Sequence, residues 1–461
     1  MPADPRTIAE LARALQARDL SAEEATARCL ARIEARNPSI NAFIAVRAEQ
    51  ARAEAREADR EIAEGRFRGP LQGVPLSIKD IIDLEGLPTT AGSRVRDGHR
   101  ALADAPIVAN LRKAGAIILG KTNLHEFALG TTNEDSAFGP VRHPLDPARS
   151  PGGSSGGSAA AVLDGMSFAS IGTDTGGSVR IPAAACGLVG LKPSLGEIPL
   201  DGIVPLSTTM DHVGPLCRSV EDAGILYDAL RGVERPRGTS RDPGPDGPPP
   251  HDVRGVRLGV LRGYFVALLD PQVASAFDAA CARLADAGAV LDEVEIPHAA
   301  DIAPIYLHIV LSEAAAFHAK TLDSRADDYT PNVRIRLEMG RYILAQDYVR
   351  ALRGREVLIA EVEEALRGRN GLLLPSLAVP ATKLGAASVK VGSVEEPVRN
   401  ITLRLTQLFN ITGHPAITVP CGATIEGLPI GAQLVGARNA TGGLLRLAAA
   451  AEPYLGPGTS G

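Results

Sequence analysis

Residues 150–194 constrain the fold more than any other segment, because two clusters of glycine and serine lie there between apolar stretches. The segment reads SPGGSSGGSAAAVLDGMSFASIGTDTGGSVRIPAAACGLVGLKPS. Glycine permits positive φ and lets backbone N–H groups approach a ligand closely. The apolar flanks argue against a flexible linker. The clusters therefore indicate turns whose N–H groups point at an anion or an oxyanion.

Short apolar runs broken by glycine and proline alternate with helical patterns along most of the 461 residues. Ser21 with Glu24 forms a capping-box pattern at the start of one helix, and further helices are expected at about 47–64 and 106–113. Such alternation is typical of an α/β core with a largely parallel or mixed sheet. The length is ample for a sizeable core without disulfides or metals.

A Pro/Gly-rich stretch at 231–255 predicts a linker or surface excursion. The chain after it reads as a β-α-β unit over 256–296, two helices at about 302–320 and 346–367, and strands at 371–376 and 414–420. We therefore expect one domain, residues 1–461. Within it we expect a catalytic core at 68–220 and a second lobe at 256–461 that completes the sheet and the substrate pocket.

Charge and composition exclude several classes of function. The formal net charge is −6 and no basic block occurs, which argues against nucleic acid or an anionic membrane as a partner. The sequence predicts neither a secretory leader nor a membrane-spanning segment. Five widely spaced cysteines predict buried thiols in a reducing cytoplasm, and no ligand spacing suggests zinc. We accordingly expect no metal and no cofactor.

Two common motifs fit the first cluster poorly. Gly152 and Gly157 have the spacing of a phosphate-binding loop, but Ser158 stands where its lysine belongs. Gly-x-Ser-x-Gly matches at Ser154 and again at Ser155, yet a nucleophile elbow needs a strand directly before the serine, and the preceding HPLDPARSPGG reads as loop. A Ser-His-Asp α/β-hydrolase therefore remains an alternative.

Ser178 is a better candidate nucleophile, because it follows a predicted strand and ends the run Thr175-Gly176-Gly177. A serine hydroxyl needs a base, and residues 150–194 contain no histidine. Lys79 lies in the apolar strand GVPLSIKDII, where desolvation can lower the pKa of an amine by several units. Lys79 is thus either a catalytic base or an ordinary surface charge.

The order of Lys79, GGSSGGS and GTDTGGSVRIPAAACGLVGLKPS, with FNITGHPAITVP near the C-terminus, resembles the amidase signature family of serine hydrolases. The resemblance implies a large mixed β-sheet core surrounded by helices, and a Ser-cisSer-Lys triad. Ser178 corresponds to the nucleophile, Ser154 to the bridging serine that follows a cis peptide bond, and Lys79 to the base. The implied oxyanion hole comprises Thr175, Gly176 and Gly177. The implied substrate contacts are Gly130, Thr131 and Ser155.

This resemblance predicts an amidase that cleaves a carboxylic amide C–N bond through an acyl-enzyme, with carbamates or esters as extensions. The partner is then a small-molecule amide, and the chain could pair as a homodimer. One alternative is the glutaminase subunit of a tRNA-dependent amidotransferase, although Ile181 stands where that subunit usually has glutamine. Another is a catalytically dead binding module, which the presence of Lys79, Ser154 and Ser178 disfavours. We expect Asp174 and Arg180 to tie down the nucleophile loop.

Overall fold

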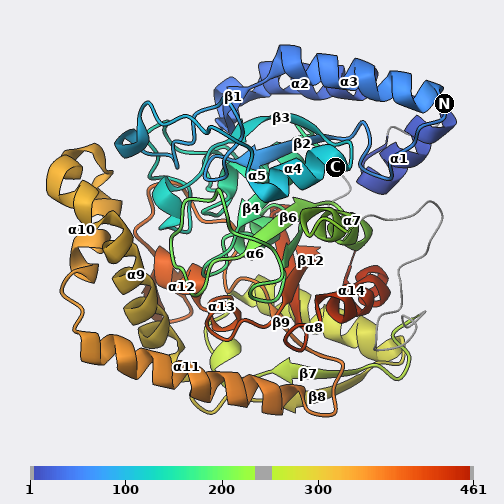
Figure 1. The fold of residues 1–461 in the computed structure, drawn as a ribbon. Helices are drawn as coiled ribbons and strands as arrows, with labels where there is room; N and C mark the ends of the chain where they lie inside the picture. The colour runs from blue at the N-terminus through green and yellow to red at the C-terminus, as the bar shows by residue number, and fades with distance from the viewer. Residues whose placement is uncertain (1–4, 234–251, 457–461) are drawn as a thin grey trace.

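The computed structural model describes residues 5–233 and 252–456. Within these residues eleven strands form one mixed sheet in the order β1-β3-β2-β4-β6-β5-β12-β13-β9-β7-β8, and β10 and β11 form a separate hairpin. Helices surround the sheet, with α2 and α3 beyond its β1 end and α9, α10 and α11 forming an arc at the periphery (Figure 1). The predicted large mixed sheet with surrounding helices is therefore confirmed.

The strands of the described residues are short, and most are fully buried. They are β1 (Phe43–Val46), β2 (Pro75–Lys79), β3 (Ile117–Thr122), β4 (Ala169–Thr173), β5 (Val189–Lys192), β6 (Val213–Cys217), β7 (Arg257–Leu261), β8 (Val290–Val294), β9 (Gly371–Pro375), β10 (Ser388–Val391), β11 (Val394–Pro397), β12 (Ala416–Ala423) and β13 (Pro429–Val435).

The helices begin and end close to the predicted limits where a prediction was made. They are α1 (Ile8–Ala17), α2 (Ala22–Ile40), α3 (Ala48–Ala63), α4 (Pro106–Lys113), α5 (Gly156–Leu163), α6 (Arg180–Ala185), α7 (Val220–Leu230), α8 (Pro271–Asp286), α9 (Ile302–Arg325), α10 (Pro331–Gly340), α11 (Ala345–Leu366), α12 (Val398–Leu403), α13 (Leu408–Ile411) and α14 (Thr441–Leu455).

The capping box predicted at the start of α2 is present. The Ser21 hydroxyl accepts a hydrogen bond from Glu24 N at 3.0 Å, and the Glu24 carboxylate accepts one from Ser21 N at 2.9 Å. Two of the N–H groups that a helix start leaves unpaired are satisfied in this way, so this local signal fixes where α2 begins.

Strand β2 lies between β3 and β4 and runs parallel to both. Alternate side chains of a strand point to opposite faces, so Leu76 and Ile78 share one face while Ser77 and Lys79 share the other. All five residues of β2 are buried, because the strand is interior to the sheet and both of its faces are covered. The sequence of β2 therefore carries a lysine into the core at the carboxyl end of the strand.

The chain after residue 252 completes the same sheet. Strands β7 and β8 are parallel and joined by α8, which confirms the predicted β-α-β unit, and β7 also pairs with β9. Residues 234–251, within the predicted linker at 231–255, lie outside the described part of the chain. The division into a 68–220 core and a 256–461 lobe remains a prediction.

Helix α9 differs from the expectation that no segment would be long and apolar enough to span a membrane. Residues 299–328 pass that test by length and composition, but half of the apolar window is buried inside the protein. Helix α9 packs against both α10 and α11, which accounts for its apolar character without a membrane.

Candidate active site

Lys79 is completely buried at the carboxyl end of β2. Its Nζ donates hydrogen bonds to Ser154 Oγ and to Thr173 Oγ1, each at 2.8 Å. Burial lowers the pKa of Lys79 to about 7, although the nearby carboxylates of Asp174 and Asp211 act in the opposite direction. The ammonium of Lys79 makes no ion pair among the described residues, so a large fraction of the amine is neutral near pH 7.

Ser154 sits in a tight turn that precedes α5. The Gly153–Ser154 peptide bond is cis, as the resemblance implies. A Cβ added to Gly153 would lie 2.8 Å from Asn133 N, so only glycine fits beside that backbone. Asn133 Oδ1 also accepts a hydrogen bond from Gly156 N at 3.0 Å, at the start of α5. These contacts fix Ser154 beside Lys79.

Ser178 lies on the loop that joins β4 to α6, and its backbone meets the Ser154 turn. Its carbonyl oxygen accepts a hydrogen bond from Ser155 N at 3.3 Å. Ser178 is 6% exposed, whereas Ser154 and Lys79 have no exposure. No hydrogen bond joins the hydroxyls of Ser178 and Ser154 among the described residues. Catalytic hydrogen bonds often tighten only when substrate is bound.

A buried ion pair holds the Ser178 loop in place, as the sequence predicted for Asp174 and Arg180. Arg180 Nη2 lies 2.9 Å from Asp174 Oδ1, and Arg180 Nε lies 3.0 Å from Asp174 Oδ2. Asp174 also accepts a hydrogen bond from Val179 N at 3.1 Å. Burial alone would raise the pKa of Asp174, but the Arg180 guanidinium holds it well below its usual range. Asp174 is therefore ionised at any working pH.

The loop that ends at Ser178 contains backbone N–H groups without an acceptor in the described residues. The N–H groups of Thr175, Gly176, Gly177 and Ser178 donate to no acceptor among the residues that the structure describes. The loop lies next to a hydroxyl and is held by the ion pair of Asp174, so these donors are available to a ligand. Thr175 is further fixed by its hydroxyl, which donates to Asp211 Oδ1 at 2.5 Å.

Sequence analysis missed several residues that hold the same loop. Asn410 Nδ2 donates to Asp174 Oδ1 at 2.9 Å, and Thr406 Oγ1 donates to the Gly176 carbonyl at 2.6 Å. Arg180 Nη1 donates to Gln433 Oε1 at 2.5 Å. Asn410 belongs to the FNITGHPAITVP segment that carries part of the family resemblance, which is the one signal that pointed here. Thr406 and Gln433 have no motif.

The three predicted substrate contacts have different surroundings. Ser155 has no exposure and its hydroxyl donates to the Thr173 carbonyl at 3.2 Å, so it holds the turn against β4. A Cβ on Gly130 would overlap the imidazole of His125, and Thr131 is 4% exposed next to Gly153. Contact of Gly130, Thr131 or Ser155 with substrate remains a prediction.

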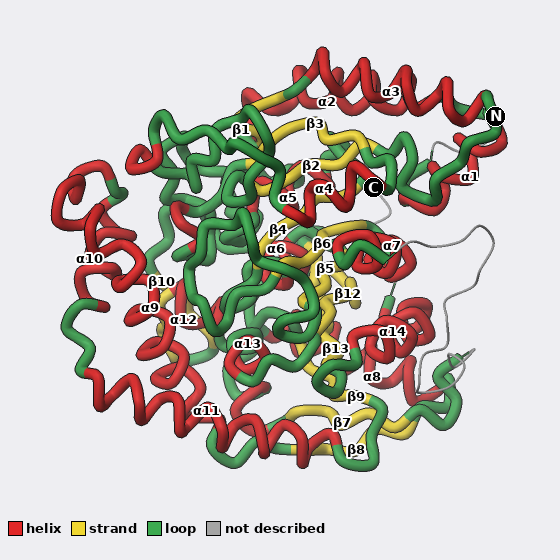
Figure 2. The backbone as a smooth tube through the Cα atoms, viewed as in Figure 1, coloured by secondary structure: helices red, strands yellow, loops and turns green. Residues whose placement is uncertain are grey.

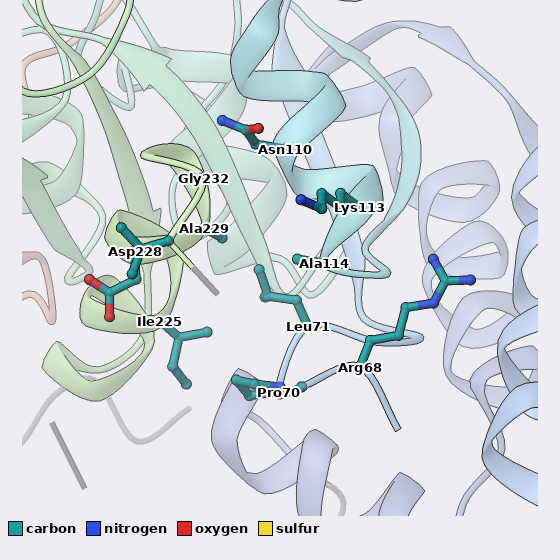
Figure 3. A pocket seen from close by; sticks show the side chains of 12 residues that line it. Arg68, Pro70, Leu71, Asn110, Lys113, Ala114, Ile225, Asp228, Ala229 and Gly232 are labelled. Carbon is teal, nitrogen blue, oxygen red and sulfur yellow. The ribbon is translucent and has the colours of Figure 1, made fainter. Parts of the chain in front are cut away.

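Other features lie away from this site or have structural roles. A cavity of about 470 Å³ lies between residues 68–71, α4 and the end of α7 (Figure 3), near the amino end of β2 and away from Lys79. The five cysteines are buried free thiols, as predicted. No cluster of three or more metal-ligating side chains occurs in residues 5–233 and 252–456.

The large mixed sheet, with a buried lysine beside a serine and a glycine loop of free N–H groups, has the architecture of an α/β hydrolytic enzyme. The Amidase family model matches residues 24–445, and the chain belongs to that family. An amidase from Pseudomonas putida is 41% identical, over 92% of this chain and 90% of its own length. A glutamyl-tRNA(Gln) amidotransferase subunit from Chloroflexus aurantiacus is 38% identical, over 93% of this chain and 92% of its own length.

Solved structures agree with this assignment. A crystal structure of an amidase superposes with a TM-score of 0.90 at 38% identity, and it covers 98% of this chain and 100% of the other. A peptide amidase from Stenotrophomonas maltophilia superposes with a TM-score of 0.81 at 29% identity, over 98% of this chain and 97% of its own. The predicted family, fold and class of enzyme, a hydrolase acting on C–N bonds, are thereby confirmed.

Proposed function

We propose that this chain is a stand-alone amidase that cleaves the C–N bond of a small carboxylic amide through an acyl-enzyme on Ser178. The observation that carries the proposal is the fully buried Lys79, whose Nζ lies 2.8 Å from Ser154 Oγ and whose pKa burial lowers to about 7. A buried amine without an ion-pair partner among the described residues fits a base better than it fits a structural cation.

Neutral Lys79 takes the proton of Ser154 while its own N–H continues to donate to Thr173. Ser154 in turn takes the proton of Ser178 as the Ser178 oxygen attacks the amide carbon. The same relay then returns a proton to the nitrogen of the collapsing tetrahedral intermediate, so that the amine leaves neutral. A water molecule attacks the acyl-enzyme by the same route, which releases the carboxylic acid and regenerates Ser178.

The charge that develops on the carbonyl oxygen needs donors that are already oriented. The N–H groups of Thr175, Gly176, Gly177 and Ser178 make no hydrogen bonds within the described chain, and the loop that holds them is anchored by Asp174 and Arg180. One oriented donor in such a hole contributes about 3–4 kcal/mol to transition-state stabilisation. Because the hole binds the oxyanion and not the leaving atom, carbamates and esters are also expected substrates.

The second candidate is a glutaminase subunit, since relatives at 38% identity are named as subunits of glutamyl-tRNA(Gln) amidotransferase. Ile181 in place of the usual glutamine favours the stand-alone enzyme. We place the enzyme in the cytoplasm, in keeping with its five free thiols, and we propose that it acts without nucleic acid or membrane. A homodimer is our expectation for its assembly, which analytical ultracentrifugation would test.

The test is ammonia release by the purified chain from glutamine and from a panel of aliphatic and aryl amides. We expect hydrolysis of simple amides without any partner, and loss of both turnover and the active-site acyl adduct in Ser178→Ala. Ser158→Ala, a buried serine on α5 outside the proposed relay, is the matched control. Activity that persists in Ser178→Ala would require another nucleophile. If glutamine is the only amide hydrolysed, and it is hydrolysed only in the presence of a second protein, the second candidate is favoured.

A further inference from the structure

A cavity of about 370 Å³ adjoins the loop that carries the oxyanion donors. Tyr306 of α9 and Leu403 and Arg399 of α12 contribute to its wall. The same Tyr306 and Leu403 pack on Gly176: an added Cβ there would overlap the Tyr306 hydroxyl oxygen and lie 3.0 Å from Leu403 Cδ2. The cavity is therefore next to the place where the scissile carbonyl would sit. Helices α9 and α12 lie on the same side of the central strands (Figure 2).

Two polar side chains in this wall have unused hydrogen-bonding capacity. Tyr306 is 5% exposed, and its hydroxyl makes no hydrogen bond within the described chain. The guanidinium of Arg399 is partly buried and makes no hydrogen bond or ion pair with any described residue. Both residues line the cavity, so a ligand there could take the hydrogen bonds that the protein leaves unmade. A hydroxyl and a guanidinium without protein partners at one cavity indicate a ligand that accepts hydrogen bonds from both.

The charges around Arg399 are predominantly positive. Arg336 of α10 acts on the charge of Arg399, and its Nη1 donates to the carbonyl oxygen of Leu129, the neighbour of the predicted substrate contact Gly130, at 3.1 Å. Burial first, and Arg336 second, lower the pKa of Arg399 to about 10, so it stays protonated at neutral pH. Glu396 also lines the cavity but makes no ion pair with Arg399. Arg404 and Tyr264 also line the cavity, but the Arg404 guanidinium lies over the Tyr264 ring and donates to the Tyr264 carbonyl oxygen at 2.8 Å, whereas Arg399 has no such partner.

We propose that Arg399 and Tyr306 bind a carboxylate carried by the acyl part of the substrate, so that monoamides of small dicarboxylic acids are preferred. A planar guanidinium fork matches a carboxylate, and the tyrosine hydroxyl supplies a further donor. The leaving group of a primary amide is ammonia, so a recognised charge must lie on the acyl part. Glu396 in the same wall disfavours a dianion such as a phosphate. The inference rests on the proposed amidase function.

The test compares kcat/KM for the monoamides of succinic and glutaric acid with kcat/KM for butanamide and pentanamide, which lack the carboxylate. We expect the wild type to prefer the charged substrates. Arg399→Gln should lower this preference by about 10- to 100-fold, chiefly through KM, because one charge-assisted contact is lost. Arg399→Lys, which keeps the charge, should retain part of it.

Arg350→Gln is the matched control, since it removes an arginine that pairs with Asp347 on the exposed face of α11. It should keep the wild-type ratio of charged to neutral substrates. Equal ratios in the wild type and Arg399→Gln would overturn the inference, as would a wild type without preference for the monoamides.

A binding measurement separates this inference from the proposed function. Isothermal titration of succinate should show at least tenfold weaker binding to Arg399→Gln than to the wild type, with Arg399→Lys between them. If neutral amides are hydrolysed through Ser178 but succinate binding does not depend on Arg399, the inference fails alone. If succinate binding depends on Arg399 but no amide is hydrolysed, the proposed function fails and the anion site stands.

Discussion

In the proposed mechanism, the protonation of Lys79 sets the pH dependence of acylation. Burial lowers the pKa of this amine from an ordinary value of 10.5 to about 7. At pH 7 about half of the molecules then carry a neutral amine, whereas an amine of ordinary pKa would be neutral in roughly one molecule in 3,000. The low-dielectric surroundings of β2 therefore raise the active fraction by about three orders of magnitude.

The assay is kcat/KM for a primary amide between pH 5 and 9, with ammonia release as the readout. The relay needs the unprotonated base, so kcat/KM should fall about tenfold for each pH unit below about 7 and level off above it. Enzyme held at each pH and then returned to pH 8 should recover full activity, which excludes unfolding as the cause. A flat profile between pH 5.5 and 8.5, or a tenfold rise per pH unit that continues to pH 9 without levelling, would refute the assignment of Lys79 as base.

Two variants sharpen the result. The Asp211 carboxylate raises the pKa of Lys79, so Asp211→Asn should move the fall in kcat/KM to lower pH. The side-chain oxygen of the asparagine can still accept the hydrogen bond from the Thr175 hydroxyl. Burial raises the pKa of Asp211 itself to about 6, so its charge acts on Lys79 mainly above that pH. Lys79→Arg keeps a positive charge that is not lost at these pH values, and should be inactive throughout. A shift of the fall in kcat/KM to higher pH in Asp211→Asn would contradict the electrostatic argument.

Two further predictions concern the loop that carries Ser178. Arg180→Met should lower the free energy of unfolding, measured in urea, by about 3–5 kcal/mol, because it leaves the buried Asp174 carboxylate unpaired. Arg350→Met on the surface should change that free energy too little to resolve. Equal effects of the two substitutions would show that the buried ion pair is not what stabilises the loop. Gly176→Ala should lower kcat/KM at least tenfold, because the added Cβ overlaps the Tyr306 hydroxyl. Gly442→Ala should leave kcat/KM unchanged, because its Cβ meets only one side-chain nitrogen, at 3.7 Å. Full activity in Gly176→Ala would mean that the loop is less constrained than these contacts indicate.

Local sequence was sufficient for elements whose cause is local. The capping box at Ser21 fixed the start of α2, and proline at the first turn marked α4 at Pro106–Lys113. The order of Lys79, Ser154 and Ser178 identified the family, because a long motif with fixed chemistry is specific even without coordinates. The sequence could not show whether Lys79 was buried or exposed, since an apolar strand with a lysine at its end suits either location.

Residues that come from distant parts of the chain required the tertiary structure. Thr406 and Asn410 reach the Ser178 loop from more than 200 positions away, and Tyr306 and Arg399 line one cavity from two different helices. None of these residues has a local signature, because a threonine, tyrosine or arginine acquires its role from what packs around it. The sequence alone determined the chemistry available to this protein. Folding decided that the amine of Lys79 is desolvated and that the guanidinium of Arg399 has no protein partner. Both depend on the whole packed structure and not on neighbours in sequence.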